Sequence, residues 1–484
     1  MPPQAEMPHP DPPTTATTAM AKDPNPIDFV IAGGGMAGLV LALSLRARLG
    51  VTPQVYEQAP AFADGIGGAI GMYANGLRVV RDADAELLKR LRDEGYPYLR
   101  RRWYRHDGTE VANGDEARLA PGGREELTPM GIRRWKLQRA LYEACVEKGI
   151  PVHFGRRIEY VVKREGGLIE LGFAGGECSP VLARVVFGAD GVKSKVRDAV
   201  AGRNAQEPEY TGVTCLMGAA PVPSSQRGIC FPSSATTKCH MCTYPTGPNE
   251  SIFQMYFPTP VENPEQWGGF GEEKAEEEIE ELVAKMTEHG WAEKFIRPVR
   301  EADPTSLVRV GLRAREPLTK WVEGTIVLLG DAAHPPVPYI GQGAMMAIED
   351  AGALSLILQK LCHDPTTGKF DFNRLPAALK LYQDVRIPRT ASVLGKSKVL
   401  GRSQQDRADS WVYNLWREWS IKVQVGLNGT LPIMLPGVEY DYEEETERAI
   451  EKFEDLAVPA EDEGGPEDSV AIGGEEPVML TSAA

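Results

Sequence analysis

Apolar runs that end at glycine or aspartate mark three separate parts of the chain. They read IDFVIA at 27–32, VVFGAD at 185–190 and TIVLLGD at 325–331. Short apolar runs rich in β-branched residues are typical of strands buried on both faces of a parallel sheet. A helical pattern follows the first and third runs, and a polar segment that can start a helix follows the second. The pattern therefore predicts an α/β fold.

Residues 205–320 have a different pattern. Strand-like runs there read GVTCLMGAAP, CHMCTYP and SIFQMYF, and the turn-rich segment TGPNE separates the last two. Such runs joined by a short turn predict an antiparallel sheet. Residues 272–290 predict a charged amphipathic helix with a solvated outer face.

After residue 360 the pattern is helical. The segment DSWVYNLWREWSIKVQV carries three tryptophans. Ordinary helix packing is the favoured interpretation, and a cover over a pocket or a homodimer contact are the alternatives. The first 26 residues, rich in proline and threonine, and the acidic tail from residue 456 are predicted to be disordered.

Composition limits the classes of function. With 42% hydrophobic and 25% charged residues over 484 positions, the chain is typical of an ordinary globular protein of more than one domain. A formal net charge of −15 argues against a general nucleic-acid surface, so small molecules are the expected partners. No apolar window approaches the roughly 18 residues of a membrane helix, so no integral membrane segment is expected.

The seven cysteines do not form a disulfide pattern and predict a reducing, cytoplasmic compartment. Cys239 and Cys242 form the one CxxC segment. No second cysteine pair lies nearby, so a buried strand is favoured over metal or redox chemistry, and no metal site is predicted.

The first apolar run leads into the motif G-x-G-x-x-G, formed by Gly33, Gly35 and Gly38. The first two glycines allow a tight turn and a close approach of backbone to a pyrophosphate, and the third lets the helix pack on the strand. The helix N-terminus offers free amides to the phosphates. Gly50 stands where the C-terminal cap of this helix is expected. Glu57, which ends the next strand, is placed to accept hydrogen bonds from ribose hydroxyls. The segment therefore predicts a dinucleotide site.

The second run ends at Asp190, and two interpretations are open there. The carboxylate either caps the following helix or belongs to the same ligand site as the glycine motif.

The third run ends at Asp331, whose carboxylate could accept a hydrogen bond from a ribityl hydroxyl. The prolines after it, Pro338 among them, fix φ and form a stiff wall. Gly341 and Gly343 bring backbone amides close to a ligand at the start of a helix. A helix N-terminus favours the negative charge of a reduced flavin. The turn is therefore predicted to hold a flavin, with Pro338 and Gly341 shaping the site beside its ring system.

These three motifs, in this order, resemble those of single-component (group A) FAD-dependent monooxygenases of the aromatic-hydroxylase and epoxidase type, especially fungal natural-product members. The resemblance implies a Rossmann-like FAD-binding domain, an antiparallel-sheet substrate domain and a helical C-terminal region. It also implies non-covalent FAD, NADPH or NADH as co-substrate, O2, and a flavin C4a-hydroperoxide that oxygenates an aromatic ring or an alkene.

The resemblance assigns six further roles to residues of this chain. Glu57 matches the ribose-binding acid, Asp331 the aspartate of the G-D motif and Asp190 that of the D-G motif; Gly71, Arg134 and Ala344 match positions that contact FAD or flank the flavin. Alternatives remain for the last three. Gly71 could serve only a loop, Arg134 could be a solvated helix charge, and Ala344 could be plain helix packing.

Two positions depart from the family pattern. Met217 stands where many members have arginine, and Met345 where many have asparagine. Both changes favour an apolar substrate, unless the methionines are ordinary packing. Tyr244, Met255 and Tyr256 are candidates for the pocket lining.

The predicted function is therefore epoxidation or hydroxylation of an apolar secondary metabolite such as a polyketide, polyene or terpenoid. A flavin-dependent oxidase, dehydrogenase or halogenase, or a non-catalytic FAD-binding protein, are the alternatives. The predicted boundaries are 1–26 for the leader, 27–204 and 321–360 for the FAD-binding domain, 205–320 for the substrate domain, 361–455 for the helical region and 456–484 for the tail.

Overall fold

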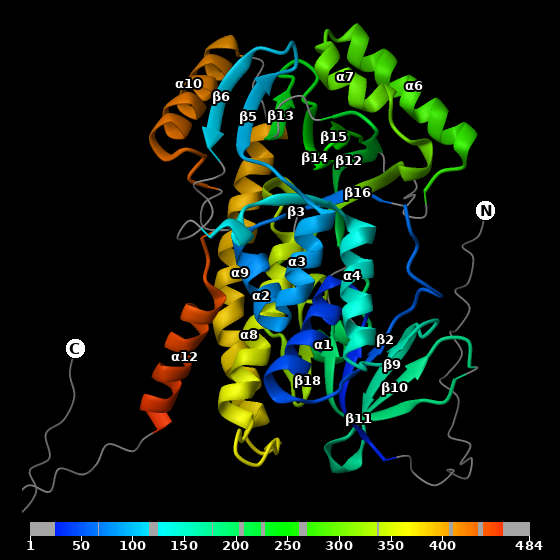
Figure 1. Cartoon of the computed structure of the whole chain (residues 1–484), viewed down its shortest axis with the longest axis vertical. Coiled ribbons are helices and arrows are strands. Elements are labelled where there is room, and N and C mark those ends of the chain that lie inside the picture. Colours follow the sequence, from blue (N-terminus) through cyan, green and yellow to red (C-terminus); the bar gives the residue numbers. More distant parts are fainter. Residues whose placement is uncertain are drawn as a thin grey trace, which may run out of the picture.

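The computed structural model shows two stacked parts, an eight-stranded sheet surrounded by helices and a seven-stranded sheet across one end of it (Figure 1). The described residues are 25–65, 67–115, 124–176, 178–202, 208–223, 228–260, 269–335, 338–405, 410–433 and 439–457. Most of the predicted leader and tail, residues 1–24 and 458–484, lies outside them.

The eight-stranded sheet joins the three predicted apolar runs. Its main path is β17 (Val322–Glu323), β18 (Ile326–Leu328), β11 (Val181–Gly188), β1 (Ile27–Ala32), β2 (Gln54–Tyr56) and β8 (Val152–His153). Two more strands, β9 (Ile158–Lys163) and β10 (Ile169–Phe173), extend from β11 as an antiparallel ribbon. Strands β18, β11, β1, β2 and β8 run parallel. The carboxyl ends of the three predicted runs therefore meet at one edge of the sheet.

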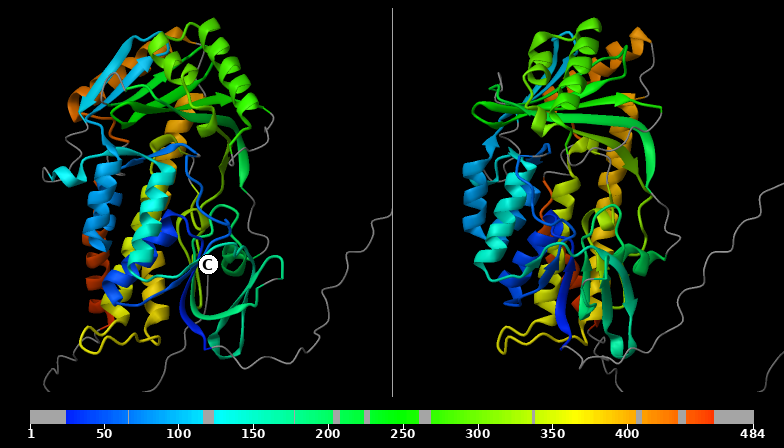
Figure 2. Two further views of the ribbon diagram at one scale, coloured as in Figure 1. Left: turned by 45° about the vertical axis from the view of Figure 1, so that its right-hand side comes forward. Right: turned by 90° about the vertical axis from the view of Figure 1, so that its right-hand side faces the viewer.

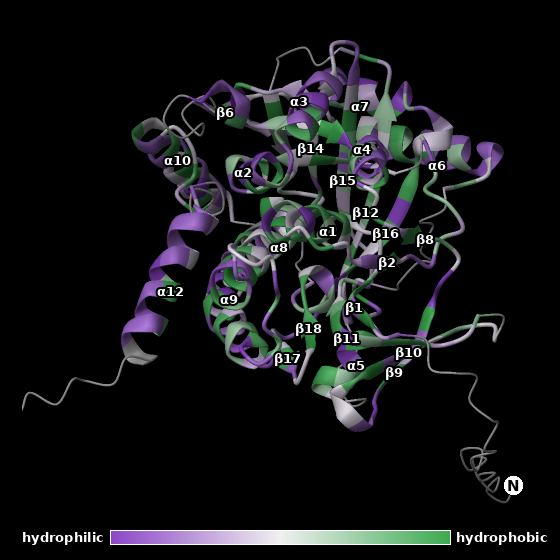
Figure 3. Ribbon diagram, turned by 60° about the horizontal axis from the view of Figure 1, so that its bottom comes forward, coloured by the Kyte–Doolittle hydropathy of each residue, from purple (hydrophilic) through white to green (hydrophobic). Residues whose placement is uncertain are grey.

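Helix α1 (Met36–Leu49) lies between this sheet and helix α8 (Gly343–Cys362). Ten of its residues are buried, because it is covered on several sides, and both helices are largely hydrophobic (Figure 3). The predicted end of the helix is confirmed. Gly50 adopts φ +71°, a left-handed conformation that glycine reaches without strain, and its N–H bonds the carbonyl of Arg46.

The third glycine of the motif lets α1 approach the sheet. A Cβ on Gly38 would lie 2.0 Å from the carbonyl oxygen of Gly33 and 3.1 Å from Cγ2 of Ile31. No side chain fits there, so the helix can take its place only with glycine at this position.

The seven-stranded sheet contains the three strands predicted from residues 205–320. Its order is β16 (Val308–Ala314), β12 (Glu209–Ala220), β15 (Glu250–Pro258), β14 (His240–Gly247), β13 (Gly228–Ser233), β5 (Arg100–Arg105) and β6 (Glu110–Asp115). All neighbours pair antiparallel except β13 and β5, which run parallel. The predicted hairpin at TGPNE is confirmed by β14 and β15. Strands β5 and β6 come from a segment outside the predicted range 205–320.

Alternation along these strands separates two faces. Met241, Phe253 and Met255 form one cluster with helices α6 (Glu272–Glu288) and α7 (Glu293–Arg300), which cover the outer face (Figure 2). Cys215 and Tyr256 lie on the inner face, toward the part that contains the eight-stranded sheet. We call this part the FAD-type domain, because its motifs resemble those of FAD-binding domains. The predicted helix at 272–290 is α6, and its acidic side is exposed.

The remaining elements connect the two parts. They are β3 (Ala69–Met72), β4 (Tyr96–Pro97) and β7 (Met130–Arg133) in a small sheet; α2 (Ala74–Ala83), α3 (Ala85–Glu94), α4 (Arg134–Glu147) and α5 (Val196–Ala201); and α9 (Leu375–Gln405), α10 (Trp411–Asn428) and α12 (Tyr442–Ala457) in the C-terminal region. Helix α9 runs from the FAD-type domain up to the seven-stranded sheet, and α10 lies beside β6 (Figure 1). No helix among the described ranges is long and apolar enough to cross a membrane.

Ordinary helix packing does not explain the tryptophans of α10. Trp416 and Trp419 are 61% and 62% exposed. The packed face of the helix is formed instead by Ile421 and Val425, which contact Trp103 and its neighbours in β5 and β6. That favoured interpretation was wrong because the apolar residues of α10 occupy more than one face of the helix.

We expect Gly38→Ala to destabilise the FAD-type domain by about 1–3 kcal/mol, because the added methyl group forces α1 away from Gly33. Gly395→Ala is the matched control, since it also lies inside a helix but its Cβ would meet no atom within 4 Å. The control should be neutral or more stable by up to about 1 kcal/mol, because alanine favours helix. Urea unfolding measures the free energy of unfolding of both variants. Equal values would contradict the inference that α1 approaches Gly33 too closely for a side chain at position 38.

Candidate functional site

The three predicted strand ends lie side by side. The N–H of Ala189 donates to the carbonyl of Ala32 at 2.8 Å, and the N–H of Leu329 donates to the carbonyl of Gly188 at 3.0 Å. Gly33 has φ +103°, and a Cβ there would lie 2.4 Å from the carbonyl oxygen of Ala189. The glycine motif therefore touches the segment that contains Asp190.

The N-terminus of α1 is open toward this edge. Its cap residue Gly35 forms no side-chain cap, and its first turn contains no acidic residue. A Cβ on Gly35 would meet nothing within 4 Å, in contrast to the crowding at Gly33 and Gly38. The unneutralised positive end of the helix dipole therefore faces space that a phosphate group can occupy.

Glu57 is fixed at the end of β2 by two backbone donors. Its Oε2 accepts from the N–H of Gly34 at 2.7 Å, and its Oε1 accepts from the N–H of Ala59 at 2.8 Å. These bonds tie the glycine turn to β2. Each carboxylate oxygen keeps a second lone pair for a hydroxyl group.

The capping interpretation of Asp190 agrees with the structure. Its Oδ2 accepts from the N–H groups of Lys195 and Val196 at 2.7 and 3.2 Å, and Ser194 donates to its Oδ1 at 2.5 Å. Desolvation by burial raises the pKa of Asp190, and these hydrogen bonds oppose the increase. The side chain organises the turn before α5, while its backbone lies against Gly33.

Asp331 and Arg134 are charged, solvent-exposed and nevertheless poorly solvated. Desolvation raises the pKa of Asp331, opposed by the charges of His334 and Arg134. Desolvation likewise lowers the pKa of Arg134, opposed by the charges of Asp331 and Glu57. Both side chains are therefore accessible to a ligand, although the surrounding protein removes part of their hydration.

Arg134 and Asp331 do not pair with each other. Within the described residues, neither side chain forms a hydrogen bond or an ion pair within 4 Å. Their scaffold holds them apart, since Arg134 begins α4 and Asp331 lies in the 3-10 helix η6 (Gly330–Ala332) after β18. Both groups remain able to bind a ligand between them.

Helix α8 presents a second N-terminus without a side-chain cap or an acid in its first turn. Gly341, just before it, has φ +65° and is exposed, and Gly343 and Ala344 are partly exposed in the first turn. Ala344 also packs against the main core, as its alternative interpretation required. Pro338 begins the 3-10 helix η7 (Pro338–Ile340), while Pro336 and Val337 of the proline segment lie outside the described residues.

Gly71 lies in strand β3 rather than in a loop. A Cβ at this position would lie 2.8 Å from the hydroxyl of Tyr98 and 3.3 Å from the ring of Tyr73. The glycine therefore makes room for these tyrosines next to the N-terminus of α2.

A buried ionic network fixes the turn that carries Asp331. Oδ2 of Asp350, in α8, accepts from the N–H of Gly330 at 2.8 Å and lies 2.5 Å from Nε2 of His334. Oδ1 of Asp350 accepts from Nε of Arg386, in α9, at 2.7 Å. Burial alone would raise the pKa of Asp350, but His334, Arg386 and the Gly330 N–H outweigh it and lower the pKa.

The neighbouring acid, Glu349, extends this network to α2. It forms ion pairs with Arg386 and Arg389, both at 2.9 Å. Nδ2 of Asn75 donates to Glu349 at 2.7 Å and to Gln342 at 2.8 Å. Gln342 precedes the first turn of α8, so the network holds both the Asp331 turn and the N-terminus of α8 in place.

The sequence analysis missed this network. Its one signal is the pair of adjacent acids in the otherwise apolar segment AMMAIEDAGALSLIL, because buried acids require partners. The partners Arg386 and Arg389 are more than 30 residues away and cannot be identified from that segment.

The two methionine departures have different surroundings. Met345 is fully buried, its sulfur accepts from the N–H of Tyr73 at 3.4 Å, and a Cβ on Gly76 would lie 2.4 Å from that sulfur. The packing interpretation therefore describes Met345. Met217 is partly exposed on the inner face of the sheet, beside Gly68.

The inner face also carries a cation that the sequence analysis did not expect. Arg101, in β5, is buried, and its guanidinium donates to the hydroxyl of Tyr73 at 3.3 Å. The guanidinium also lies 5.9 Å from the ring centre of Phe231. The loss of arginine at position 217 therefore does not leave this face without positive charge.

The three candidate pocket residues divide between the two faces of the sheet. Tyr256 and Tyr244 are buried on the inner face, where the Tyr244 hydroxyl donates to the carbonyl of Ala69 at 2.8 Å. Met255 lies on the opposite face against α6 and α7, because adjacent residues of a strand point to opposite sides. Met255 is therefore excluded from an inner pocket.

Comparison with known proteins agrees with this geometry. The sequence profile of the FAD binding domain family matches residues 27–368. The chain is 31% identical over 373 residues to 6-hydroxynicotinate 3-monooxygenase of Bordetella bronchiseptica, covering 75% of this chain and 89% of the relative. It is 31% identical over 378 residues to a 3-amino-4-hydroxybenzoate 2-monooxygenase of Streptomyces platensis, covering 77% and 87%.

A solved structure shows the same fold. The crystal structure of CtdE in complex with FAD and a substrate has a TM-score of 0.70 at 17% identity, and the match covers 89% of this chain and 99% of that one.

Fold, site and sequence together define a flavin-dependent oxidoreductase. The chain belongs to the FAD binding domain family and is a FAD-dependent monooxygenase. The prediction of FAD as cofactor is confirmed, and the family uses NAD(P)H. Open space over Gly35, two uncapped helix N-termini and the unpaired charges of Asp331 and Arg134 fit an extended, doubly charged dinucleotide.

We expect Asp350→Asn to lower the free energy of unfolding by about 3–5 kcal/mol at pH 7, because it leaves the guanidinium of Arg386 without one of its buried counter-charges. Asp384→Asn, which breaks an exposed ion pair with Lys380, is the control and should cost less than about 1 kcal/mol. Urea unfolding followed by tryptophan fluorescence measures both.

The pH dependence of stability tests the same ion pairs, by comparing wild type with Asp350→Asn. Since the folded protein lowers the pKa of Asp350, the carboxylate stabilises the fold above the pKa of an unfolded aspartate and loses this effect as pH falls through the folded pKa. The difference in the free energy of unfolding between wild type and Asp350→Asn should therefore become smaller as the pH is lowered. A difference that does not change with pH would contradict the assigned ion pairs.

Proposed function

We propose that this monooxygenase hydroxylates or epoxidises an apolar secondary metabolite, such as a polyketide, polyene or terpenoid. The observation that supports this substrate class is the inner face of the seven-stranded sheet. It combines apolar side chains with aromatic rings. The buried members are Val213, Cys215, Tyr256, Val308, Val310 and Leu312, and Met217, Cys242 and Tyr339 pack against them. Tyr339 belongs to η7, so this face adjoins the turn that carries Asp331 and Gly341.

In this proposal each group of site residues binds a different part of FAD. The amides at the start of α1, with Gly33, Gly35 and Gly38 shaping the turn, bind the pyrophosphate, and Glu57 accepts hydrogen bonds from the ribose. Arg134, at the start of α4, would contact the FAD. Asp331 accepts hydrogen bonds from the ribityl chain, and the turn at Asp190 closes the site beside Gly33.

The remaining residues act at the ring system. The N-terminus of α8, with Gly341, Gly343 and Ala344, stabilises negative charge there, and Pro338 and Gly71 border the space. FAD supplies the redox chemistry, taking reducing equivalents from NADPH or NADH and activating O2. The apolar inner face excludes water from the oxygenation step.

All seven cysteines are free thiols, four of them buried. We propose a reducing compartment, the cytoplasm, as the place of the reaction, because such thiols persist there.

We expect Asp331→Ala to purify with little flavin and to bind added FAD about 10–100-fold more weakly, since a charged hydrogen-bond acceptor contributes about 1.5–3 kcal/mol. The ratio of flavin to protein absorbance measures occupancy, and titration with FAD gives the affinity. Asp364→Ala is the control, because Asp364 lies in an exposed turn far from the strand ends. Full occupancy of Asp331→Ala would show that its assigned role is wrong.

The proposed reaction is tested by turnover. Apolar polyketides and terpenoids should include compounds that accelerate NAD(P)H consumption, and mass spectrometry should find one oxygen atom from labelled O2 in the product. Stoichiometric hydrogen peroxide without label in any product would favour an oxidase or dehydrogenase. Unchanged NAD(P)H consumption with every compound would favour a protein that only binds FAD.

A further inference from the structure

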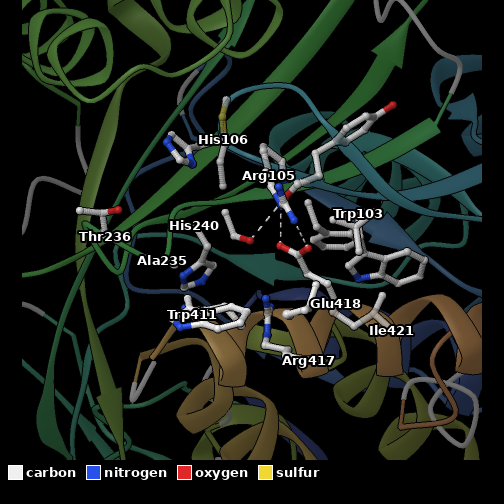
Figure 4. A pocket seen from close by; sticks show the side chains of 18 residues that line it. Trp103, Arg105, His106, Ala235, Thr236, His240, Trp411, Arg417, Glu418 and Ile421 are labelled. Atoms are coloured by element: carbon white, nitrogen blue, oxygen red, sulfur yellow. Dashed lines mark hydrogen bonds and ion pairs between the residues drawn. The ribbon is translucent and has the colours of Figure 1, made fainter. Parts of the chain in front are cut away.

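A cavity of about 460 Å³ lies between α10 and the seven-stranded sheet (Figure 4). The sheet contributes Trp103, Phe231 and His240 to its wall, and α10 contributes Trp411 and Arg417. This volume is within the range of small-molecule sites, about 300–1,000 Å³. The aromatic rings give it flat, apolar walls suited to a ring system.

Helix α10 is fixed over the cavity by a polar and an apolar contact. Glu418 and Arg105 form a two-bond ion pair, in which Nε of Arg105 donates to Oε1 of Glu418 at 2.8 Å. One turn later, Ile421 packs in a cluster with Trp103. The cavity is therefore built by specific contacts rather than left between loosely placed elements.

The charge inside the cavity is positive, although the whole protein carries a net charge of −15. Glu418 is the one acid among the described lining residues, and Arg105 already pairs with it. The guanidinium of Arg417 forms no hydrogen bond or ion pair with a described residue, and Figure 4 shows it between Trp411 and Glu418. Desolvation lowers the pKa of Arg417, opposed by the charges of Tyr413 and Glu418.

A line of aromatic contacts connects this cavity to the flavin-side turn. His240 stacks on Tyr256 with ring centres 4.7 Å apart and planes 6° apart. The ring of His240 also lies 5.8 Å from that of Tyr339, two residues before Gly341. The cavity thus adjoins the apolar inner face on the side away from the strand ends.

We propose that this cavity binds the part of the substrate remote from the oxygenated carbon, and that Arg417 pairs with a delocalised anion there. The substrate class is an aromatic or polycyclic compound with a carboxylate, phenolate or enolate group at one end. Arg417 is then a specificity-determining residue, because a neutral analogue leaves its desolvated guanidinium unpaired. This inference rests on the proposed function, whose apolar substrate it narrows to an apolar anion.

Two probes of nearly the same shape test the proposal by binding alone. They are 8-anilinonaphthalene-1-sulfonate, an anion, and N-phenyl-1-naphthylamine, which has the same rings without the sulfonate. Isothermal titration calorimetry on the FAD-loaded protein should give Arg417→Gln an affinity for the anion about tenfold below wild type, with the neutral probe unchanged. Arg417→Lys, which keeps the charge, should retain most of the affinity for the anion.

Three further variants test whether the probes bind in this cavity. Trp411→Ala should weaken both probes, because Trp411 lines the cavity. Lys422→Gln and Trp419→Ala, on exposed positions of α10 outside the cavity lining, should change neither probe. Equal effects of Arg417→Gln on both probes, no effect on either, or a larger effect of Trp419→Ala than of Trp411→Ala would overturn the proposal.

These outcomes are separable from those of the proposed function. Probe binding requires neither NAD(P)H nor oxygen transfer, so its failure leaves the monooxygenase proposal standing. A failure to find labelled product leaves the binding result standing. With a turnover substrate in hand, Arg417→Gln should raise KM and leave kcat nearly unchanged, which a general structural defect would not do.

Discussion

The hydrogen bonds of the buried Asp350 carboxylate hold the turn that carries Asp331, and the rest of the cofactor site depends on that turn. A buried charge is stable only when partners surround it, and Asp350 has three of them: the Gly330 amide, His334 and Arg386. These partners come from the turn after β18 and from α9, while Asp350 belongs to α8. Because all three partners reach the same buried carboxylate, they fix the turn relative to both helices, and this places Asp331 at the strand end.

The sequence predicted those parts of the fold that local patterns encode. The three buried strands, α1 with its Gly50 cap and the β14–β15 hairpin follow from runs of fewer than 20 residues, and the structure confirms each of them. The parallel pairing of β13 with β5 joins segments about 130 residues apart, and nothing local to either strand indicates it. For the same reason β5 and β6, which belong to the same sheet, fall outside residues 205–320, from which that sheet was predicted.

The site was predictable to a similar extent. Gly33, Gly38 and the backbone of Asp190 lie together, because motif spacing and strand ends place them. The supporting ions were not predictable, since Glu349 and Arg386 meet through the packing of α8 on α9. Period-two alternation alone could have excluded Met255 once Tyr256 was assigned to the inner face. The exposure of Trp416 and Trp419 required the position of α10 itself.

Positive potential in this acidic protein is concentrated where the scaffold prevents charges from neutralising one another. The ends of α1 and α8 lack acidic caps, and Arg134 stays apart from Asp331 because each is anchored to a different element. At the far side of the inner face Glu418 is engaged by Arg105, and the adjacent Arg417 forms no ion pair with any residue that the structure describes. A charge that is desolvated but unpaired in the protein gains more from a ligand anion than one already in a salt bridge, because the ligand need not displace a partner. The acids that stabilise the fold, Glu349 and Asp350, thus form ion pairs in the interior. The same packing keeps the ligand-facing groups away from partners of opposite charge.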